Sequence, residues 1–252
     1  MAIPRAKVIT IASVKGGTGK TTTALNLAGT YSLMKKKTLI LDFDLYSGGI
    51  ALSLNVDIKT DLYKLAYDMS VNKYKNINDY ILNYNEYIDI IPAPKDPRYA
   101  SKIEKKYINT ILKKVITKYE VIIIDTNHVL DTTNLILFDK SDTIVYIVNN
   151  SPQDVKNLKS MISIHKDMEK ENYVVILNES NMKLNEIFSN YDIKNIIKSN
   201  IDYTIPRTFY NKNINKFVIK GKIMLLDKNI RILNKKTIKT FNTLALDLLE
   251  RW

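Results

Sequence analysis

Val14-Lys15-Gly16-Gly17-Thr18-Gly19-Lys20-Thr21-Thr22 is the stretch that decides the fold of this chain. It follows the apolar run from Lys7 to Ala12 (KVITIA), which predicts a buried β-strand. It precedes Ala24 to Ala28 (ALNLA), which predicts the first turns of a helix. A strand, a glycine-rich loop and a helix in this order form the context of a phosphate-binding loop. Glycine lets backbone N–H groups approach phosphates, and the helix start adds a partial positive charge.

Two side chains of the loop have specific roles in this interpretation. Lys20 is placed to reach the β- and γ-phosphates of a nucleotide, and the Thr21 hydroxyl can ligate Mg²⁺. The ligands expected are therefore a nucleoside triphosphate and Mg²⁺. The alternative is a glycine-rich turn without a ligand. The residues expected to bind the nucleotide are Lys15, Gly16, Gly17, Thr18, Gly19, Lys20, Thr21 and Thr22.

The loop departs from the usual pattern G-x-x-x-x-G-K-[ST] at its first position, which holds Val14, and it carries a second lysine, Lys15. The sequence K-G-G-T-G-K-T-T resembles the deviant Walker A motif of the ParA/MinD family of P-loop ATPases. The resemblance implies an ATP-bound homodimer in which Lys15 reaches the nucleotide of the other subunit. It also implies catalytic roles for Lys15 and Lys20.

Acidic residues end two apolar runs that predict strands, Thr38 to Asp44 (TLILDFD) and Val121 to Asp125 (VIIID). Ligands gather at the carboxyl ends of parallel strands, so these acids should lie near the phosphates. Asp42 and Asp44 resemble the D-x-D element of the family, which implies that Asp42 helps to hold Mg²⁺ and that catalytic Asp44 positions the attacking water. Asp125 resembles a Walker B aspartate that binds Mg²⁺ through water. The metal ligands expected are Thr21, Asp42 and Asp125; the alternative for Asp42 and Asp44 is N-capping acids in a turn.

Two further elements resemble the adenine-binding parts of the family. Asn178 ends the predicted strand from Tyr173 and corresponds to an asparagine that reads the adenine; a turn asparagine is the alternative. Pro206-Arg207 follows the predicted strand Asn200 to Ile205 and resembles an I-P-x loop that packs on the adenine. His128 stands in a Thr-Asn-His sequence where an aspartate-threonine-proline pattern is usual. It could sense the γ-phosphate or a partner, or be a polar loop residue.

The remaining pattern alternates helices with strands. It predicts one α/β domain over residues 1–252, with a doubly wound, mostly parallel sheet flanked by helices, as in ParA/MinD-like P-loop NTPases. The other strands expected are 87–91 and 142–148, and the helices expected are 21–34, several within 50–84, 103–118, 151–168, 211–220 and 236–252.

Composition limits the classes of protein. The 252 residues are 45% hydrophobic and 25% charged, as in globular domains. Cysteine is absent, which excludes disulfides and iron–sulfur ligation and with them a nitrogenase-reductase-like role. No apolar run reaches the ~18 residues of a membrane span. The first residues, MAIPRAKV, do not resemble a signal peptide. A cytoplasmic chain is expected, recruited by partners to the pole or the inner face of the membrane.

The net charge of +12 raises the question of an anionic partner. Arg207 to Lys239 contains ten basic residues and one acid, Asp227. This segment could meet DNA nonspecifically, an anionic membrane or an acidic protein, or the charge could reflect compositional bias. In the predicted C-terminal helix a docked core stripe is expected, and a MinD-like membrane helix is the alternative. That stripe is Ile238, Phe241, Leu244, Ala245, Leu248 and Trp252.

The resemblance thus implies a slow, partner-regulated ATP hydrolase that dimerises with ATP and positions or assembles a cellular machine together with other proteins. Within the family, Asp42 to Leu52, Pro92-Ala93-Pro94 and Asp125 to His128 resemble the CpaE/TadZ branch of pilus-assembly proteins. The alternatives are a ParA-like chromosome or plasmid partitioning ATPase, a MinD-like membrane-cycling ATPase, and a bacterial tyrosine kinase. The C-terminal tyrosine cluster of such kinases is missing, since no tyrosine follows Tyr210.

Overall fold

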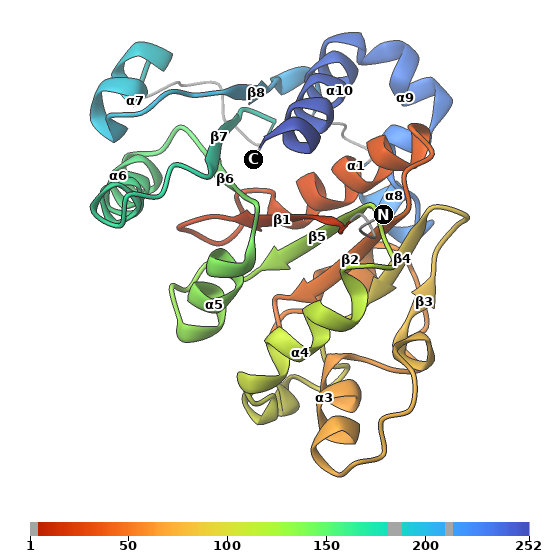
Figure 1. Ribbon diagram of the computed structural model, residues 1–252. Helices are drawn as coiled ribbons and strands as arrows, with labels where there is room; N and C mark the ends of the chain where they lie inside the picture. The colour runs from red at the N-terminus through yellow and green to blue at the C-terminus, as the bar shows by residue number, and fades with distance from the viewer. Residues whose placement is uncertain (1–4, 181–187, 210–213, 252) are drawn as a thin grey trace.

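The computed structural model describes residues 5–180, 188–209 and 214–251. One eight-stranded sheet runs through these residues in the order β3-β4-β2-β5-β1-β6-β7-β8 (Figure 1). All neighbouring strands are parallel except β3, which pairs antiparallel to β4 at the edge. The strands are β1 (Lys7–Ala12), β2 (Thr38–Phe43), β3 (Leu82–Asn83), β4 (Ile88–Ile91), β5 (Val121–Thr126), β6 (Thr143–Val148), β7 (Tyr173–Asn178) and β8 (Tyr203–Ile205). The predicted fold class, a mostly parallel sheet flanked by helices, is confirmed.

Helices cover both faces of the sheet (Figure 1). One face packs against α1 and α10, and the other packs against α3, α4 and α5 on one half and α6 and α7 on the other half. The helices are α1 (Lys20–Leu33), α2 (Gly49–Ser53), α3 (Leu62–Ser70), α4 (Lys106–Val115), α5 (Thr132–Lys140), α6 (Pro152–Asp167), α7 (Asn190–Ile197), α8 (Ile214–Ile219), α9 (Lys228–Leu233) and α10 (Lys235–Glu250).

Side-chain alternation explains why the central strands are continuous apolar runs. In β5, Val121 and Ile123 enter the core under α1, whereas Ile122 and Ile124 enter the core under α4. Both sets are fully buried, because successive side chains of a strand point to opposite faces and each face is covered by helices. The sheet is therefore a rigid platform whose carboxyl ends carry the candidate site.

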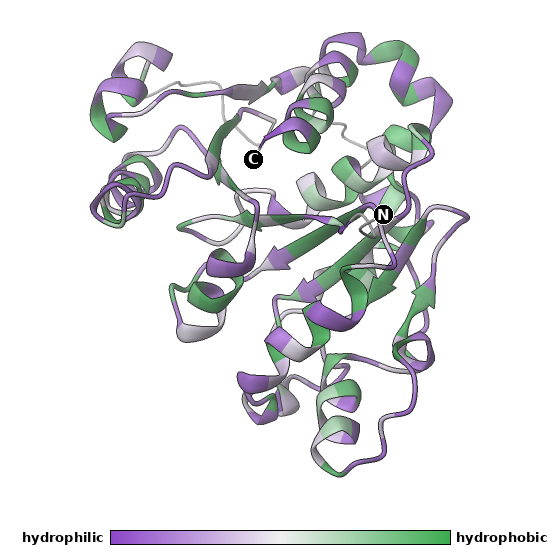
Figure 2. Ribbon diagram, in the orientation of Figure 1, coloured by the Kyte–Doolittle hydropathy of each residue, from purple (hydrophilic) through white to green (hydrophobic). Residues whose placement is uncertain are grey.

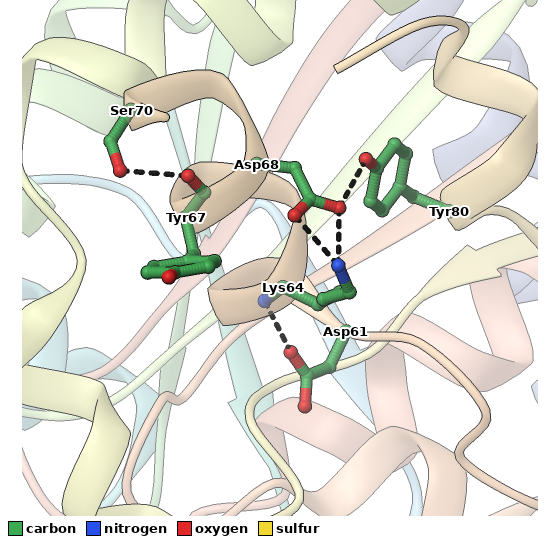
Figure 3. A network of polar contacts seen from close by, with 6 residues as sticks. All are labelled: Asp61, Lys64, Tyr67, Asp68, Ser70 and Tyr80. Atoms are coloured by element: carbon green, nitrogen blue, oxygen red, sulfur yellow. Dashed lines mark hydrogen bonds and ion pairs between the residues drawn. The ribbon is translucent and has the colours of Figure 1, made fainter. Parts of the chain in front are cut away.

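The region between α2 and β4 contains short elements held by polar contacts. Asp61 caps α3 by accepting a 2.8 Å hydrogen bond from the Lys64 backbone N–H (Figure 3). Buried Asp68 accepts hydrogen bonds from Lys64 Nζ at 2.6 Å and from the Tyr80 hydroxyl at 2.7 Å. Burial alone raises the pKa of Asp68, but the bonds from Lys64 and Tyr80 outweigh it and hold that pKa below its usual value. This network joins α3 to the 3₁₀ turn Ile77–Tyr80.

Several predicted boundaries were wrong. The helix predicted from Ile103 to Lys118 is α4, Lys106–Val115, preceded by a 3₁₀ turn over Pro97–Lys102. The strand predicted from Asn200 begins at Tyr203. Helix α10 buries four residues of the predicted apolar stripe in the core that it shares with α1 and the sheet: Phe241, Leu244, Ala245 and Leu248. The prediction that this stripe docks on the core is confirmed for these four residues. Trp252 and the start of the helix predicted over 211–220 lie outside the described residues.

Candidate functional site

The loop between β1 and α1 depends on two glycines in left-handed conformations. Gly17 has a φ of 74° and Gly19 a φ of 100°. A Cβ atom at Gly19 would lie 2.5 Å from Asn178 Nδ2, so a side chain there would have to displace the Asn178 amide. Gly19 is also the N-cap of α1, and among the described residues no side chain caps this helix. The first N–H groups of α1 are therefore directed at the loop, which suits an anionic ligand.

Lys20 lies under this loop with its ammonium group largely withdrawn from water. Its Nζ atom donates a 3.0 Å hydrogen bond to Ser13 Oγ, which in turn donates to the Lys15 carbonyl oxygen at 2.6 Å. Burial lowers the pKa of Lys20, although Asp125 and Asp44 oppose this effect. A phosphate near Nζ would complete the charge balance of this buried cation.

The two predicted carboxylates of β2 and β5 are brought together by strand register, because Asp42 lies opposite Asp125. Thr21 Oγ1 donates a 2.6 Å hydrogen bond to Asp125 Oδ2. Both carboxylates are fully buried. Burial raises the pKa of Asp125 to about 7 against the opposing effects of Thr21 and Lys20. Burial and the charge of Asp125 likewise raise the pKa of Asp42.

This donor set fits a magnesium ion held partly by the nucleotide. Asp125 Oδ1 is a buried oxygen that has no hydrogen-bond partner among the described residues. The Thr21 hydroxyl and the Asp42 carboxylate supply further hard oxygen atoms, which Mg²⁺ prefers. Within the described ranges there is no group of three acidic or histidine side chains that could hold a metal by itself. Phosphate oxygens and water would therefore have to complete the shell.

Asp42 and Asp44 occupy different positions in the turn that follows β2. Asp42 accepts hydrogen bonds from the backbone N–H groups of Ile50 at 3.0 Å and Asp44 at 3.2 Å, so this acid organises the turn from inside. Asp44 is half-buried, and its carbonyl oxygen accepts from Gly48 N at 2.8 Å. The half-buried acid, rather than the fully buried one, is accessible to a water molecule.

Lys15 lies at the rim of the loop, with 46% of its side chain exposed. Its Nζ atom is 3.8 Å from Oδ1 of Asp154, an acid near the start of α6 whose side chain is 1% exposed. Burial raises the pKa of Asp154, and Lys15 opposes the shift. The sequence pattern did not identify Asp154. Its place three residues after the N-cap Ser151 indicates only a helix start.

Asn178, Pro206 and Arg207 are neighbours because Asn178 lies opposite Ile205 in the β7–β8 ladder. Asn178 Nδ2 donates to the Thr18 carbonyl oxygen at 2.8 Å, and its Oδ1 accepts from Ser180 N at 3.0 Å. The amide thus fastens the phosphate loop to β7 and also forms the turn after it. Its role in reading adenine, and that of Pro206 and Arg207, stay predictions.

His128 is exposed beside the loop. A Cβ atom at Gly16 would lie 3.7 Å from its Nδ1 atom, so the ring stands against the first glycine of the motif. It also lines a cavity of about 280 Å³ between α5 and α6, together with Val14 and Met161. This position is compatible with each role considered for His128. The second histidine, His165, is buried away from the site, with Nε2 2.8 Å from the Tyr146 hydroxyl.

Comparison with known families and sequences gives an independent view of the site. A family model, AAA_31, described as "AAA domain", matches residues 6–176. An uncharacterized ATP-binding protein of Methanocaldococcus jannaschii is 28% identical over 158 residues, covering 63% of this chain and 58% of that protein. The sporulation initiation inhibitor protein Soj of Bacillus subtilis is 28% identical over 166 residues, covering 62% of this chain and 64% of Soj. The chain thus spans less than two thirds of the length of these two relatives.

Solved structures give the same fold over nearly the whole chain. A ParA family ATPase from Chlorobium tepidum has a TM-score of 0.80 at 19% identity, covering 95% of this chain and 98% of that one. The septum site-determining protein MinD from Pyrococcus horikoshii, complexed with Mg-ADP, has a TM-score of 0.77 at 22% identity, covering 96% of both chains. At these identities the likeness concerns the fold. Within the described residues, no helix is long and apolar enough to cross a membrane.

Proposed function

The chain belongs to the AAA domain family AAA_31 and has a ParA/MinD-type P-loop ATPase fold, and from this premise we propose that it is a Mg-ATP-dependent ATPase switch that dimerises. The observation that carries the proposal is the hydrogen bond of 2.6 Å between Thr21 and Asp125 beside buried Lys20. It places a hydroxyl, a carboxylate and an ammonium group at one end of a glycine-rich loop. Catalysis at such a site is mainly positioning and electrostatic stabilisation of the transferred phosphoryl group.

The residues divide into binding and catalytic groups in this proposal. Loop N–H groups and Lys20 bind the phosphates of ATP, and Thr21, Asp42 and Asp125 hold Mg²⁺, directly or through water. A magnesium ion bound there would supply positive charge to the phosphate oxygens. Asp44 orients the attacking water, since it is half-buried at the same edge. Asn178, Pro206 and Arg207 contact the adenine side of the nucleotide.

The two lysines of the motif differ in solvent exposure, and this difference supports different roles for them. Lys20 is 7% exposed and faces its own site, whereas the Lys15 side chain is 46% exposed at the rim. We assign Lys15 to the phosphates of a second subunit, as in a deviant Walker A loop. Turnover is slow until a partner promotes closure, because hydrolysis requires two correctly joined subunits.

Nucleotide affinity and phosphate release of three variants test the assignment. Lys20→Gln should weaken ATP binding about 100-fold, since a buried charge-assisted contact is lost. Lys15→Gln should bind ATP within about twofold of wild type but release phosphate at least about tenfold more slowly. Lys159→Gln, which changes an exposed lysine of α6, is the matched control. A Lys15→Gln protein that hydrolyses ATP normally would remove the role of this lysine across a dimer.

The output proposed for the switch is protein positioning, of the CpaE/TadZ pilus-assembly kind. Support comes from the sequence of three segments: Asp42 to Leu52, Pro92 to Pro94, and Asp125 to His128. The second segment contacts the start of α3, since Leu62 N donates to the Pro92 carbonyl oxygen at 2.9 Å. Exposed Tyr46 (61%) and Leu52 (73%) lie two and eight positions after Asp44 and offer a partner surface near the nucleotide site. A polar focus of a fluorescent fusion, lost in Lys20→Gln, is the expected cellular result.

A ParA-like partitioning ATPase is the second candidate, and the basic segment favours it. Residues 214–239 contain eight basic residues and one acid, and they span α8, α9, the segment between them and the start of α10. Lys212, another member of the segment, lies outside the described residues. Nonspecific DNA binding with a steep salt dependence would support this candidate.

A further inference from the structure

The segment that contains α8 and α9 forms a cationic hollow on the surface. A cavity of about 260 Å³ is lined on one side by Lys216, Lys220 and Lys222 and on the other by Asp227, Asn229 and Ile230. The Asp227 carboxylate already accepts hydrogen bonds from Asn229 N at 2.9 Å and Ile230 N at 3.1 Å, as the cap of α9. Throughout the described ranges, no acid pairs with any of the three lysines. The hollow is therefore suited to an anion.

Large aliphatic side chains stand beside this hollow in water. Ile219 is 74% exposed and Leu233 is 78% exposed. Ile219 follows Lys216 by three positions in α8, and Leu233 follows Asn229 by four in α9, so each is the helix-surface neighbour of a residue that lines the hollow. Helix α9 contains both hydrophilic and hydrophobic residues (Figure 2). We call Lys216, Ile219, Lys220, Lys222 and Leu233 the α8–α9 face.

The α8–α9 face is fixed to the body of the protein. Gly221, directly after α8, has a φ of 60°, and a Cβ atom there would lie 2.2 Å from the Leu54 carbonyl oxygen behind α2. The Tyr84 hydroxyl donates to the Gly221 carbonyl oxygen at 3.0 Å and accepts from Ile223 N at 3.3 Å. The lysines and the aliphatic side chains therefore belong to a segment that packs against the rest of the domain.

Two kinds of anionic surface can be compared with this arrangement. DNA phosphates would satisfy the lysines but would leave Ile219 and Leu233 against water or charge. An anionic bilayer offers phosphates to the lysines and an apolar boundary to the aliphatic side chains. We propose that the α8–α9 face docks on an anionic phospholipid bilayer, with a lipid phosphate in the lysine hollow and Ile219 and Leu233 inserted between the lipids.

The docking element differs from the C-terminal helix. The apolar stripe of α10 is buried, with Phe241, Leu244 and Leu248 at most 1% exposed, so it is not available to a membrane. Docking through α8 and α9 is peripheral and does not require ATP hydrolysis. The docking proposal therefore does not depend on the proposed ATP-driven dimerisation.

Flotation of the ADP-loaded protein with vesicles tests the proposal. The protein should float with phosphatidylcholine vesicles that contain about a fifth phosphatidylglycerol, and not with phosphatidylcholine alone. Lys216→Gln/Lys220→Gln/Lys222→Gln should reduce binding by about 100-fold, at roughly fivefold for each lysine near an anionic surface. Ile219→Ser/Leu233→Ser should reduce it by at least about tenfold, since two inserted aliphatic groups are lost.

Matched variants elsewhere separate specific docking from general charge. Lys156→Gln/Lys159→Gln/Lys194→Gln removes three exposed lysines from α6 and α7, and Leu135→Ser/Met168→Ser removes two exposed apolar groups. Both control variants should float like wild type. The proposal is overturned if wild type ignores anionic vesicles, or if Ile219→Ser/Leu233→Ser floats normally. Binding to duplex DNA that needs the three lysines but not Ile219 and Leu233, without flotation, would assign the face to nucleic acid instead.

Discussion

Thr21 Oγ1 donates a 2.6 Å hydrogen bond to Asp125 Oδ2, which joins the first turn of α1 to the end of β5. The two residues are 104 positions apart in the chain. Their contact makes the phosphate loop and the central strand one unit, so nucleotide binding and the folded state should respond to the same substitutions.

The Thr21 hydroxyl should therefore matter for both stability and metal-dependent binding. Thr21→Ala leaves Asp125 without its hydrogen bond, which should lower the free energy of unfolding by about 1–3 kcal/mol. It should also remove most of the stabilisation by Mg-ADP. Thr21→Ser retains the hydroxyl and should restore both. Thermal unfolding with ADP, with and without Mg²⁺, measures the two effects; equal stabilisation of Thr21→Ala and wild type by Mg-ADP would contradict them.

Stability should fall as pH rises from about 4 to about 7 because of Asp125. Its pKa is raised to about 7 in the folded protein, so between about pH 4 and pH 7 the folded state holds a proton that the unfolded state has lost. The contribution is present below the unfolded pKa and is lost as pH rises through the folded pKa. Asp125→Asn should remove this loss. We expect the melting temperature of ligand-free Asp125→Asn to gain on wild type from about pH 5 to pH 8.

Nucleotide binding provides the control for that experiment. Asp125→Asn should fail to bind Mg-ADP tightly at any pH, since an amide is a poorer magnesium ligand. A difference in melting temperature between the two proteins that does not change with pH would show that Asp125 is ionised throughout.

Asp154 should act through Lys15. The carboxylate is buried, and its Oδ1 atom lies 3.8 Å from Lys15 Nζ, so it holds the ammonium group at the rim of the loop. Asp154→Asn should leave nucleotide affinity within about twofold and reduce phosphate release about tenfold. Combined with Lys15→Gln, it should add nothing further, because both changes remove one interaction. Additive losses in this double-mutant cycle would separate the two residues.

The phosphate loop offers a matched pair of glycine substitutions. Gly19→Ala combines a left-handed φ with a Cβ atom 2.5 Å from Asn178 Nδ2, whereas Gly17→Ala has a left-handed φ but no neighbour within 4 Å. Gly17→Ala should cost about 1 kcal/mol of stability and Gly19→Ala clearly more, about 2–4 kcal/mol. Denaturant unfolding compares them. Equal losses of unfolding free energy in the two variants would mean that the Asn178 side chain moves aside at little cost.

Much of the fold follows from local pattern, and the exceptions have physical reasons. Central strands such as β5 are apolar on both faces and are recognisable without any tertiary information. The edge strand β3 has two residues and an antiparallel partner, so no periodicity marks it. Helix α5 begins at Thr132, four positions after His128, and its apolar residues were too few to predict a helix.

Part of the candidate site could likewise be predicted from the sequence, and part of it could not. Spacing within the loop and the acids at strand ends predicted Thr21, Asp42 and Asp125 together, since parallel strands bring their carboxyl ends to one edge. The Lys15–Asp154 pair could not be predicted, because it depends on where α6 begins relative to the loop. The direction of the Asn178 amide is set by the Thr18 carbonyl oxygen, 160 positions away.

The most direct test of the switch is molar mass by light scattering, with ADP and with a slowly hydrolysed ATP analogue, each with Mg²⁺. Wild type should remain at the monomer mass of 29.0 kDa with ADP and double it with the analogue. Lys15→Gln should stay monomeric in both. A wild-type mass that is the same with both nucleotides would contradict the ATP-driven dimer, and with it the role of Lys15 across two subunits.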